Sequence, residues 1–435
     1  MRSGAAPYFF AALIFVSAAA GCRAGPLPSL HCSGAHIADA GGRTVALHGI
    51  NMGGPFLFEG WESAFNIARS PETMYLPALK DERSLWQILT DRFGHPRMSR
   101  LREVWRTSWL TPNDVRRVAA LDLSCIRLPF WYRLLQSDQR PNRLRESGLR
   151  LLKRVLAACR KYHVYVILDL HGAPGGQAPG QYTGEEGRNQ LFKNPRFEEQ
   201  TVNLWRMIAR RYRNHSEIAG YDLLNEPMGA PTANALLDLY RRIYRAIRSV
   251  DRRHIIFMED GYRGAAFFPD PEKMGWRNVV YSTHIYDFRA TSPKAITSII
   301  NRWLPVWRKH QMRWNVPLFI GEFSTINDRQ GGVGSMKELF AAFNRYGWSW
   351  TPWNYKEVDA EDGRRSIWGL YTNDRPWDEP DPYTNSFNEL KRKFAEYRTR
   401  NLVIQADYAA ALKEYGGSDA ADGAENRGVG YSKVK

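Results

Sequence analysis

Two glutamates stand at matching places in the sequence, each at the end of a short apolar run. Glu226 closes residues 218–227 (IAGYDLLNEP), where a run of strand length ends in an Asn-Glu pair and Pro227 stops further ladder pairing. Glu322 closes PLFIGEF in the same way. One such glutamate alone is most simply a solvated loop carboxylate. Two at matching strand ends favour a catalytic pair.

The elements that must position this pair alternate regularly from Thr111 onward. Thr111 and Pro112 predict the start of a helix that runs into the strand SCIRLPF. Further helices are predicted at 150–162, 195–212, 233–250, 293–313 and 335–346, and they alternate with the apolar strands VYVILDLHG, IAGYDLLNEP, HIIFMED, NVVYSTH, PLFIGEF and GWSWTPWNY. A first strand at 44–50 brings the strand count to eight.

Eight buried strands alternating with helices indicate an α/β fold, a closed (β/α)8 TIM barrel of parallel strands. The alternative is an open doubly wound sheet, which normally has a Gly-rich nucleotide turn after its first strand. GINMGG is not such a turn, and the loop HGAPGGQAPG lacks the Lys-Ser/Thr pair of a phosphate loop. We therefore expect one barrel domain at 30–400, with a long structured insertion at 53–110 after the first strand.

In such a barrel the residues that close the strands converge at one end. Glu226 and Glu322 lie three βα units apart, which places them across the barrel mouth from each other. The residues predicted at the strand ends are Arg127, Asp169, His171, Asn225, Glu226, His284, Tyr286, Glu322 and Trp353. This set is typical of a glycosidase.

These residues resemble glycoside hydrolase family 5, whose barrels carry the two catalytic carboxylates on the fourth and seventh strands. The resemblance covers residues 44–397 and rests on an ordered set of motifs: CIRLPF, DLHG, LNEP, HIY, GEF and the Trp near the eighth strand. Within the family, DLHGAPGGQ and GINMGGPFLFEGW are similar to segments of the exo-β-1,3-glucanase branch. That similarity implies a substrate contact for Glu59, although FEGW lacks the Pro of the corresponding element.

The resemblance implies a retaining mechanism with Glu322 as the nucleophile and Glu226 as the acid and base. Arg127 and Tyr286 would hold the Glu322 carboxylate, and the charge of Glu322 would make Glu226 keep its proton. Asn225 would donate to the sugar 2-hydroxyl, His171 and His284 would bind carboxylates or sugar hydroxyls, and Trp353 would stack on the sugar. Trp61 and Trp131 are alternative stacking residues. No metal or cofactor is expected.

The chain termini predict export and a tail. Residues 1–22 have one basic residue, an apolar stretch and small residues, which is a signal-peptide pattern ending at Cys22. Lipid attachment at Cys22 and simple secretion both remain open, so we expect a secreted, periplasmic or outer-envelope protein. Cys125 and Cys159 are expected to be buried free thiols, and Cys32 stays unassigned. Residues 401–435 are expected to be a disordered C-terminal extension.

The formal charge of +16 raises an anion-binding alternative. The basic residues fall at helical spacing on predicted outward faces, so a solvated surface explains them, and no nucleic-acid partner is expected. The main hypothesis is a monomeric secreted β-glycosidase that acts on a β-glucan or glucoside with β-1,3 or β-1,4 bonds. The alternatives are a carbohydrate-binding barrel with weak catalysis and an envelope protein that binds anions through its basic surface.

Overall fold

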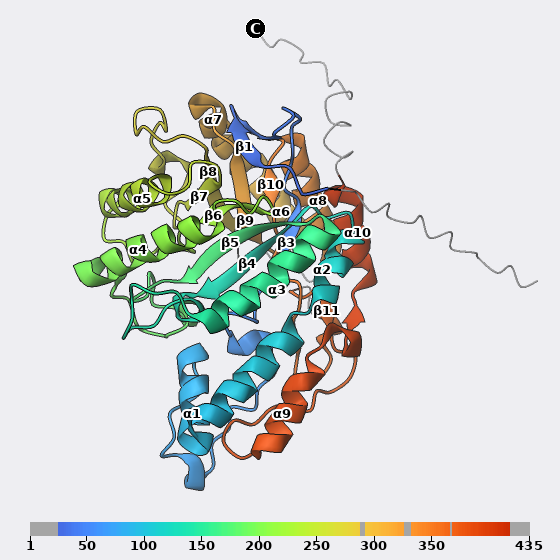
Figure 1. Ribbon diagram of the computed structural model, residues 1–435. Coiled ribbons are helices and arrows are strands. Elements are labelled where there is room, and N and C mark those ends of the chain that lie inside the picture. Colours follow the sequence, from blue (N-terminus) through green and yellow to red (C-terminus); the bar gives the residue numbers. More distant parts are fainter. Residues whose placement is uncertain (1–24, 288–291, 326–331, 366–367, 418–435) are drawn as a thin grey trace, which may run out of the picture.

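The computed structural model describes residues 25–287, 292–325, 332–365 and 368–417. Its centre is an eight-stranded parallel sheet in the order β10-β9-β8-β7-β6-β5-β4-β3, surrounded by helices (Figure 1). A parallel bridge between His48 and Trp350 joins the first and last strands, so the sheet closes on itself. The predicted (β/α)8 barrel is confirmed. The barrel strands are β3 Gly49–Asn51, β4 Cys125–Trp131, β5 Tyr165–Gly172, β6 Ile218–Asp222, β7 Ile255–Glu259, β8 Val279–Ile285, β9 Leu318–Phe323 and β10 Ser349–Trp350.

Most of the predicted helices lie where the periodicity places them. The helices are α1 Glu82–Trp109, α2 Pro112–Ala119, α3 Glu146–Tyr162, α4 Pro195–Tyr212, α5 Ala233–Arg248, α6 Pro293–Arg302, α7 Leu304–Trp314, α8 Val333–Arg345, α9 Phe387–Glu396 and α10 Ala406–Gly416. The single helix expected at 293–313 is two helices, α6 and α7. Pro305 cannot donate a backbone hydrogen bond, so a new helix begins there.

The N-terminal end of the barrel is closed by the hairpin of β1 Leu30–Ser33 and β2 His36–Asp39. Leu30 and Ile37 pack in a second hydrophobic cluster with strand residues such as Phe257 and Phe319. The first barrel strand is shorter than the predicted 44–50, because the N–H of Val45 donates to Ile37 and ties this stretch to the hairpin. Polar chemistry is therefore left to the opposite end of the strands.

The insertion at 53–110 is structured, as expected, and its main element is α1. This helix bends at Gly94, whose φ of 74° is a conformation that side chains disfavour. Figure 1 shows α1 beside α9, although the two lie far apart in sequence. Trp105 packs its ring against Phe394 and Tyr397 from the α9 region. The helix α1 of the insertion thus packs against α9, which follows the last barrel strand in the sequence.

The predicted disordered extension is wrong for residues 401–417. They include β12 Val403–Ile404, which pairs with β11 Tyr371–Thr372, and the helix α10. Tyr408, Ala411 and Leu412 are buried, and α10 lies beside α8 in Figure 1. The apolar residues of this stretch form only a narrow stripe among small and charged residues. They are buried because α10 packs against α8. Residues 418–435, like the predicted signal peptide and Cys22, lie outside the described residues.

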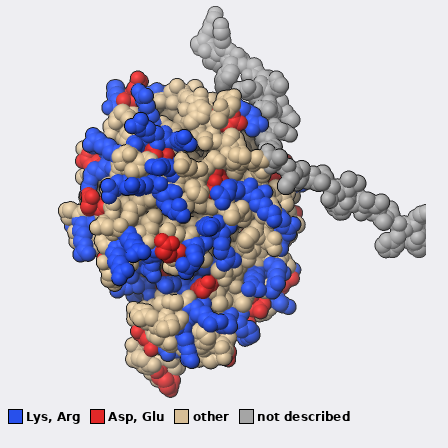
Figure 2. Space-filling view, in the orientation of Figure 1, with Lys and Arg blue, Asp and Glu red and all other residues tan. Residues whose placement is uncertain are grey.

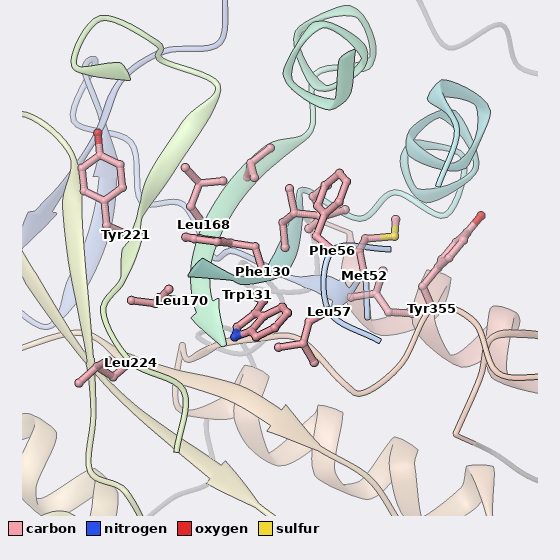
Figure 3. Close-up of a cluster of buried hydrophobic side chains, with 14 of the residues drawn as sticks. Met52, Phe56, Leu57, Phe130, Trp131, Leu168, Leu170, Tyr221, Leu224 and Tyr355 are labelled. Carbon is pink, nitrogen blue, oxygen red and sulfur yellow. The ribbon is translucent and has the colours of Figure 1, made fainter. Parts of the chain in front are cut away.

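The main hydrophobic core lies between the barrel strands and the helices. Figure 3 shows part of it, with Phe56, Phe130, Leu168 and Leu170 packed together near Trp131. Cys125 and Cys159 are buried free thiols as predicted, and Cys32 is a free thiol at intermediate burial. Within the described ranges, no helix is both long enough and apolar enough to cross a membrane.

Candidate active site

Arg127 is the centre of the polar cluster at the carboxyl ends of the strands. Its side chain is fully buried in β4. Its Nη1 donates to Glu322 Oε1 at 2.7 Å, its Nε donates to Asp222 Oδ2 at 2.9 Å, and its Nη2 donates to Asn225 Oδ1 at 2.8 Å. Asp169 Oδ2 lies 3.1 Å from Nη2. One rigid guanidinium therefore fixes groups from β5, β6 and β9 and from the loop after β6.

Glu322 lies near the end of β9 and is held from two sides. Its Oε1 accepts from Arg127, and its Oε2 accepts from the hydroxyl of Tyr286 at 3.1 Å. Both contacts were predicted from the sequence. The side chain of Glu322 is only 7% exposed, so the carboxylate presents little besides its reacting edge to solvent.

Glu226 follows β6 and faces Glu322. Its Oε1 accepts from the Tyr262 hydroxyl at 2.7 Å and lies 3.0 Å from Nδ1 of His284. Burial raises the pKa of Glu226, while the hydrogen bond from Tyr262 lowers it. The predicted direction of this shift is thus present, but its largest cause is burial rather than the charge of Glu322. A carboxyl with a raised pKa suits a proton donor.

The two carboxyl groups approach each other closely. One carboxylate oxygen of Glu226, one of Glu322 and a ring nitrogen of His284 all lie within 4.8 Å of one another. Three such atoms could in principle surround a cation. Here Arg127 donates to Glu322, and two tyrosine hydroxyls donate to the carboxylates. The arrangement therefore fits a hydrogen-bonded carboxyl pair better than a metal centre, and the absence of a metal stays a prediction.

The two histidines are buried and neutral in character. Burial lowers the pKa of His171 to about 4 and that of His284 to about 3. His171 Nδ1 lies 2.6 Å from Asp169 Oδ2, and its Nε2 lies 3.3 Å from Asn225 Nδ2 and 3.8 Å from Glu59 Oε1. His171, near the end of β5, thus lies close both to Asn225 and to Glu59 of the insertion.

Glu59 reaches the same cluster from the start of the insertion. It is 6% exposed, and its Oε2 accepts from the indole nitrogen of Trp61 at 2.8 Å. Burial raises the pKa of Glu59 to about 8, and the charges of Glu322 and Glu226 add to this rise. Glu59 therefore lies close to the carboxyl pair, and its contact with substrate stays a prediction.

The tryptophans differ in their surroundings. Trp353 stacks on His171 with ring centroids 5.3 Å apart, and its Nε1 donates to Glu62 at 2.8 Å. Trp61 is 38% exposed at the edge of the site. Trp131 is buried in the core, where Figure 3 shows it near Leu57 and Leu170, so it has no free face for a ligand.

A match to a protein-family model identifies the family of this chain. The model described as "Cellulase (glycosyl hydrolase family 5)" matches residues 92–359. The protein belongs to glycoside hydrolase family 5. The resemblance seen in the sequence is confirmed, and the protein is a glycosyl hydrolase.

Relatives of this family 5 protein carry several glycosidase names. It is 30% identical over 353 residues to a "Beta-xylosidase" of Phanerodontia chrysosporium, covering 76% of this chain and 71% of the relative. It is 29% identical over 190 residues to "Endoglucanase C" of Acetivibrio thermocellus, covering 43% and 54%. It is 26% identical over 263 residues to a "Glucan 1,3-beta-glucosidase" of Schwanniomyces occidentalis, covering 56% and 57%. The chain thus spans just over half the length of the latter two.

Solved structures share the fold of this family 5 protein. An endogalactoceramidase superimposes with a TM-score of 0.56 at 17% identity, over 89% of this chain and 85% of that chain. Endoglucanase Cel5A of Thermotoga maritima does so with a TM-score of 0.51 at 17% identity, over 70% and 90%. At this level of identity, these structures support the barrel alone.

Several polar residues of the family 5 site were missed from sequence. Asp222 is the last residue of β6, Glu259 is the last residue of β7, and Tyr262 follows three residues later. A rule that examined the end of every strand, the fifth included, would have found Glu259. Tyr262 lies in a loop and Glu62 ends the short 3-10 helix Gly60–Glu62, so their contacts depend on how these connections fold.

Proposed function

We propose that this family 5 protein is a retaining β-glycosidase with Glu322 as the nucleophile and Glu226 as the acid and base. The observation that carries the proposal is the separation of the two carboxyl groups, whose nearest oxygens lie within 4.8 Å. Retaining glycosidases hold their carboxyls about 5–5.5 Å apart, whereas inverting ones need about 6.5–9.5 Å to admit a water. An oxygen-to-oxygen distance of at most 4.8 Å supports direct attack by a carboxylate.

In the first step, a carboxylate oxygen of Glu322 forms a bond to the anomeric carbon. The bond from that carbon to the glycosidic oxygen breaks, and the leaving oxygen takes the proton of Glu226. In the second step, Glu226 removes a proton from a water molecule. The water oxygen bonds to the anomeric carbon while the bond from that carbon to Glu322 breaks. Arg127 and Tyr286 hold Glu322 in place for attack, and Tyr262 holds Glu226.

Replacing either carboxyl by its amide tests these roles. Glu226→Gln and Glu322→Gln should each lower kcat by several orders of magnitude with an unchanged unfolding transition, because both groups act in bond making and breaking. The measurement is the rate of reducing-sugar release, with Glu217→Gln as a control on a buried glutamate before β6. Retained activity in both variants would refute the proposal.

For the substrate we propose a β-glucosidic bond in a β-glucan, either β-1,3 or β-1,4. The names of the endoglucanase and glucan 1,3-β-glucosidase relatives support this class, while the β-xylosidase name offers a xyloside as the competing substrate. Product analysis on laminarin, carboxymethyl-cellulose, xylan and aryl β-glycosides separates these cases. Glucose as the sole product from laminarin would indicate β-1,3 linkage and exo action, and xylose release alone would contradict a glucan substrate.

For the location we propose export directed by residues 1–22, with lipid attachment at Cys22 as the specific form to test. The support is the sequence pattern of a charged start, an apolar stretch and small residues before the cysteine. Cys22→Ala should release the protein from a washed membrane fraction into the soluble fraction. A wild-type protein that is already soluble outside the cytoplasm would instead indicate simple secretion.

A further inference from the structure

Glu259 is a buried carboxyl group that lies directly behind Glu226. It is the last residue of β7, and its side chain is fully buried. Its Oε2 accepts the backbone N–H of Glu226 at 2.8 Å. Its backbone N–H and carbonyl both contact the Tyr240 hydroxyl, at 3.3 and 2.8 Å, so Glu259 is itself fixed by α5.

The backbone bond matters because Glu226 has an unusual conformation. Its φ is +42°, in the left-handed region that residues with side chains rarely adopt. A strained residue keeps such a conformation only when its surroundings hold it. The carboxyl of Glu259 is part of these surroundings, because it accepts the backbone N–H of Glu226.

Glu259 also faces the histidine that contacts the Glu226 carboxyl. His284 Nδ1 lies 3.0 Å from Glu226 Oε1, and His284 Nε2 lies 3.5 Å from Glu259 Oε2. If Nδ1 carries the imidazole proton, Glu226 Oε1 accepts from both His284 and Tyr262. An acid proton on Glu226 then has to lie on Oε2, the other oxygen. This tautomer leaves Nε2 as an acceptor, and a protonated Glu259 is placed to donate toward it.

The surroundings of Glu259 favour its neutral, donating form. Burial raises the pKa of Glu259 well above its usual range, and the charges of Glu226, Asp222 and Asp260 add to the rise. The other titratable groups that interact with it are Arg127, Tyr182, Tyr240, Tyr262 and His284. Arg127 is already surrounded by Asp169, Asp222 and Glu322. A protonated Glu259 can accept from the Glu226 backbone and still donate toward His284.

We propose that Glu259 is a positioning residue that holds Glu226 in its acid form, through the Glu226 backbone and through the tautomer of His284. The inference rests on the proposed role of Glu226 as the acid. It assigns a function to a side chain that lies outside the predicted set of site residues, and it explains why a carboxyl group is buried near three others.

The test compares Glu259→Gln, whose amide can both accept and donate, with Glu259→Met, which can do neither. The probes are aryl β-glucosides with leaving groups of different basicity, since only a poor leaving group needs a proton from Glu226. Glu259→Met should lower kcat/KM about 100-fold on a phenyl glucoside, because the acid is misplaced, and at most about 3-fold on a 2,4-dinitrophenyl glucoside. Glu259→Gln should stay near wild type on both.

Glu217→Met is the matched control, because Glu217 is equally buried but contacts His215 and Arg160 near the other end of β6. It should change stability without a leaving-group effect. Equal losses on both substrates in Glu259→Met, or a Glu259→Gln variant as impaired as Glu259→Met, would overturn the proposal. If Glu259→Met does not fold, Glu259→Asp, which withdraws the carboxyl from His284, should show the same leaving-group effect.

Glu226→Gln is measured beside these variants. If it shows no selective loss on the phenyl glucoside, the role of Glu226 as the acid fails, whatever Glu259 does. If it shows the loss and Glu259→Met does not, only the role of Glu259 fails.

Discussion

At the scale of single residues, the site is organised around one guanidinium that three carboxyl groups share. Arg127 lies among Asp169, Asp222 and Glu322, which together carry more charge than one arginine can neutralise. Burial raises the pKa values of Asp169 and Asp222 to about 7, although Arg127 opposes the rise. The charged state of each carboxyl in this cluster therefore depends on its neighbours, and the hydrogen bonds around Glu226 and Glu322 favour one form of each.

Tyr262→Phe should move the basic limb of the pH profile to higher pH. Glu226 must be protonated to act as an acid, so kcat/KM is lost as the pH rises through its pKa. The Tyr262 hydroxyl lowers that pKa, and its removal raises it. The measurement is kcat/KM against pH on a substrate with a poor leaving group. Tyr281→Phe, whose hydroxyl binds Pro269 instead, should leave the limb in place, and a shift to lower pH in Tyr262→Phe would contradict the assignment.

Glu59→Gln should stabilise the protein more at pH 8.5 than at pH 5. The folded Glu59 has a pKa of about 8, while an ordinary glutamate has one of about 4.3. Between these values the folded state binds more protons than the unfolded state, so the free energy of unfolding falls as the pH rises. Glutamine removes this loss. Urea unfolding at both pH values measures it, with Glu103→Gln on the exposed face of α1 as the control. Equal effects at the two pH values would contradict burial as the cause.

At the scale of elements, the two helices beside the barrel depend on one buried lysine. Lys356 Nζ donates to the carbonyls of Trp109 at 2.6 Å and Tyr397 at 2.8 Å, which are the last residue of α1 and the residue after α9. A positive charge at two helix ends is favourable, because each helix end carries unpaired carbonyls and partial negative charge. Lys356 thus joins the insertion to the end of the barrel chain.

Lys356→Met should lower the free energy of unfolding by about 2–4 kcal/mol, since it leaves two buried carbonyls without donors. Chemical denaturation measures the change. Lys391→Met, on the exposed side of α9, should change stability by less than about 0.5 kcal/mol. A Lys356→Met variant as stable as the wild type would show that water or other groups satisfy these carbonyls.

At the scale of the whole molecule, the ordered domain extends past the predicted barrel end. Leu412 of α10 is fully buried. Leu412→Ala should therefore cost about 2–5 kcal/mol, the usual range for a buried leucine. Thermal or urea unfolding checks this, with exposed Lys413→Ala on the same helix as the control. Unchanged stability in Leu412→Ala would mean that α10 contributes nothing to the fold.

The surface charge also belongs to this scale. Figure 2 shows Lys and Arg in excess of Asp and Glu on the face that carries α1 to α4. The exposed basic residues of α3 include Arg150, Lys153 and Arg154. They follow the outward face of the helix, which agrees with the solvated surface expected from their spacing. The two carboxyls that we propose to be catalytic lie apart from this face, at the strand ends, so the net charge and the proposed chemistry are separate properties.

The sequence by itself determined the barrel and the ends of its strands. Local periodicity, proline positions and motifs at strand ends are properties of short segments, and they were enough to place Glu226, Glu322, Arg127 and Tyr286. The tertiary structure alone decided what depends on distant segments meeting. The contacts of Glu259, Tyr262 and Glu62, the core position of Trp131 and the order of α10 all require partners from other elements, and the large burial that shifts the pKa values exists only after those elements pack.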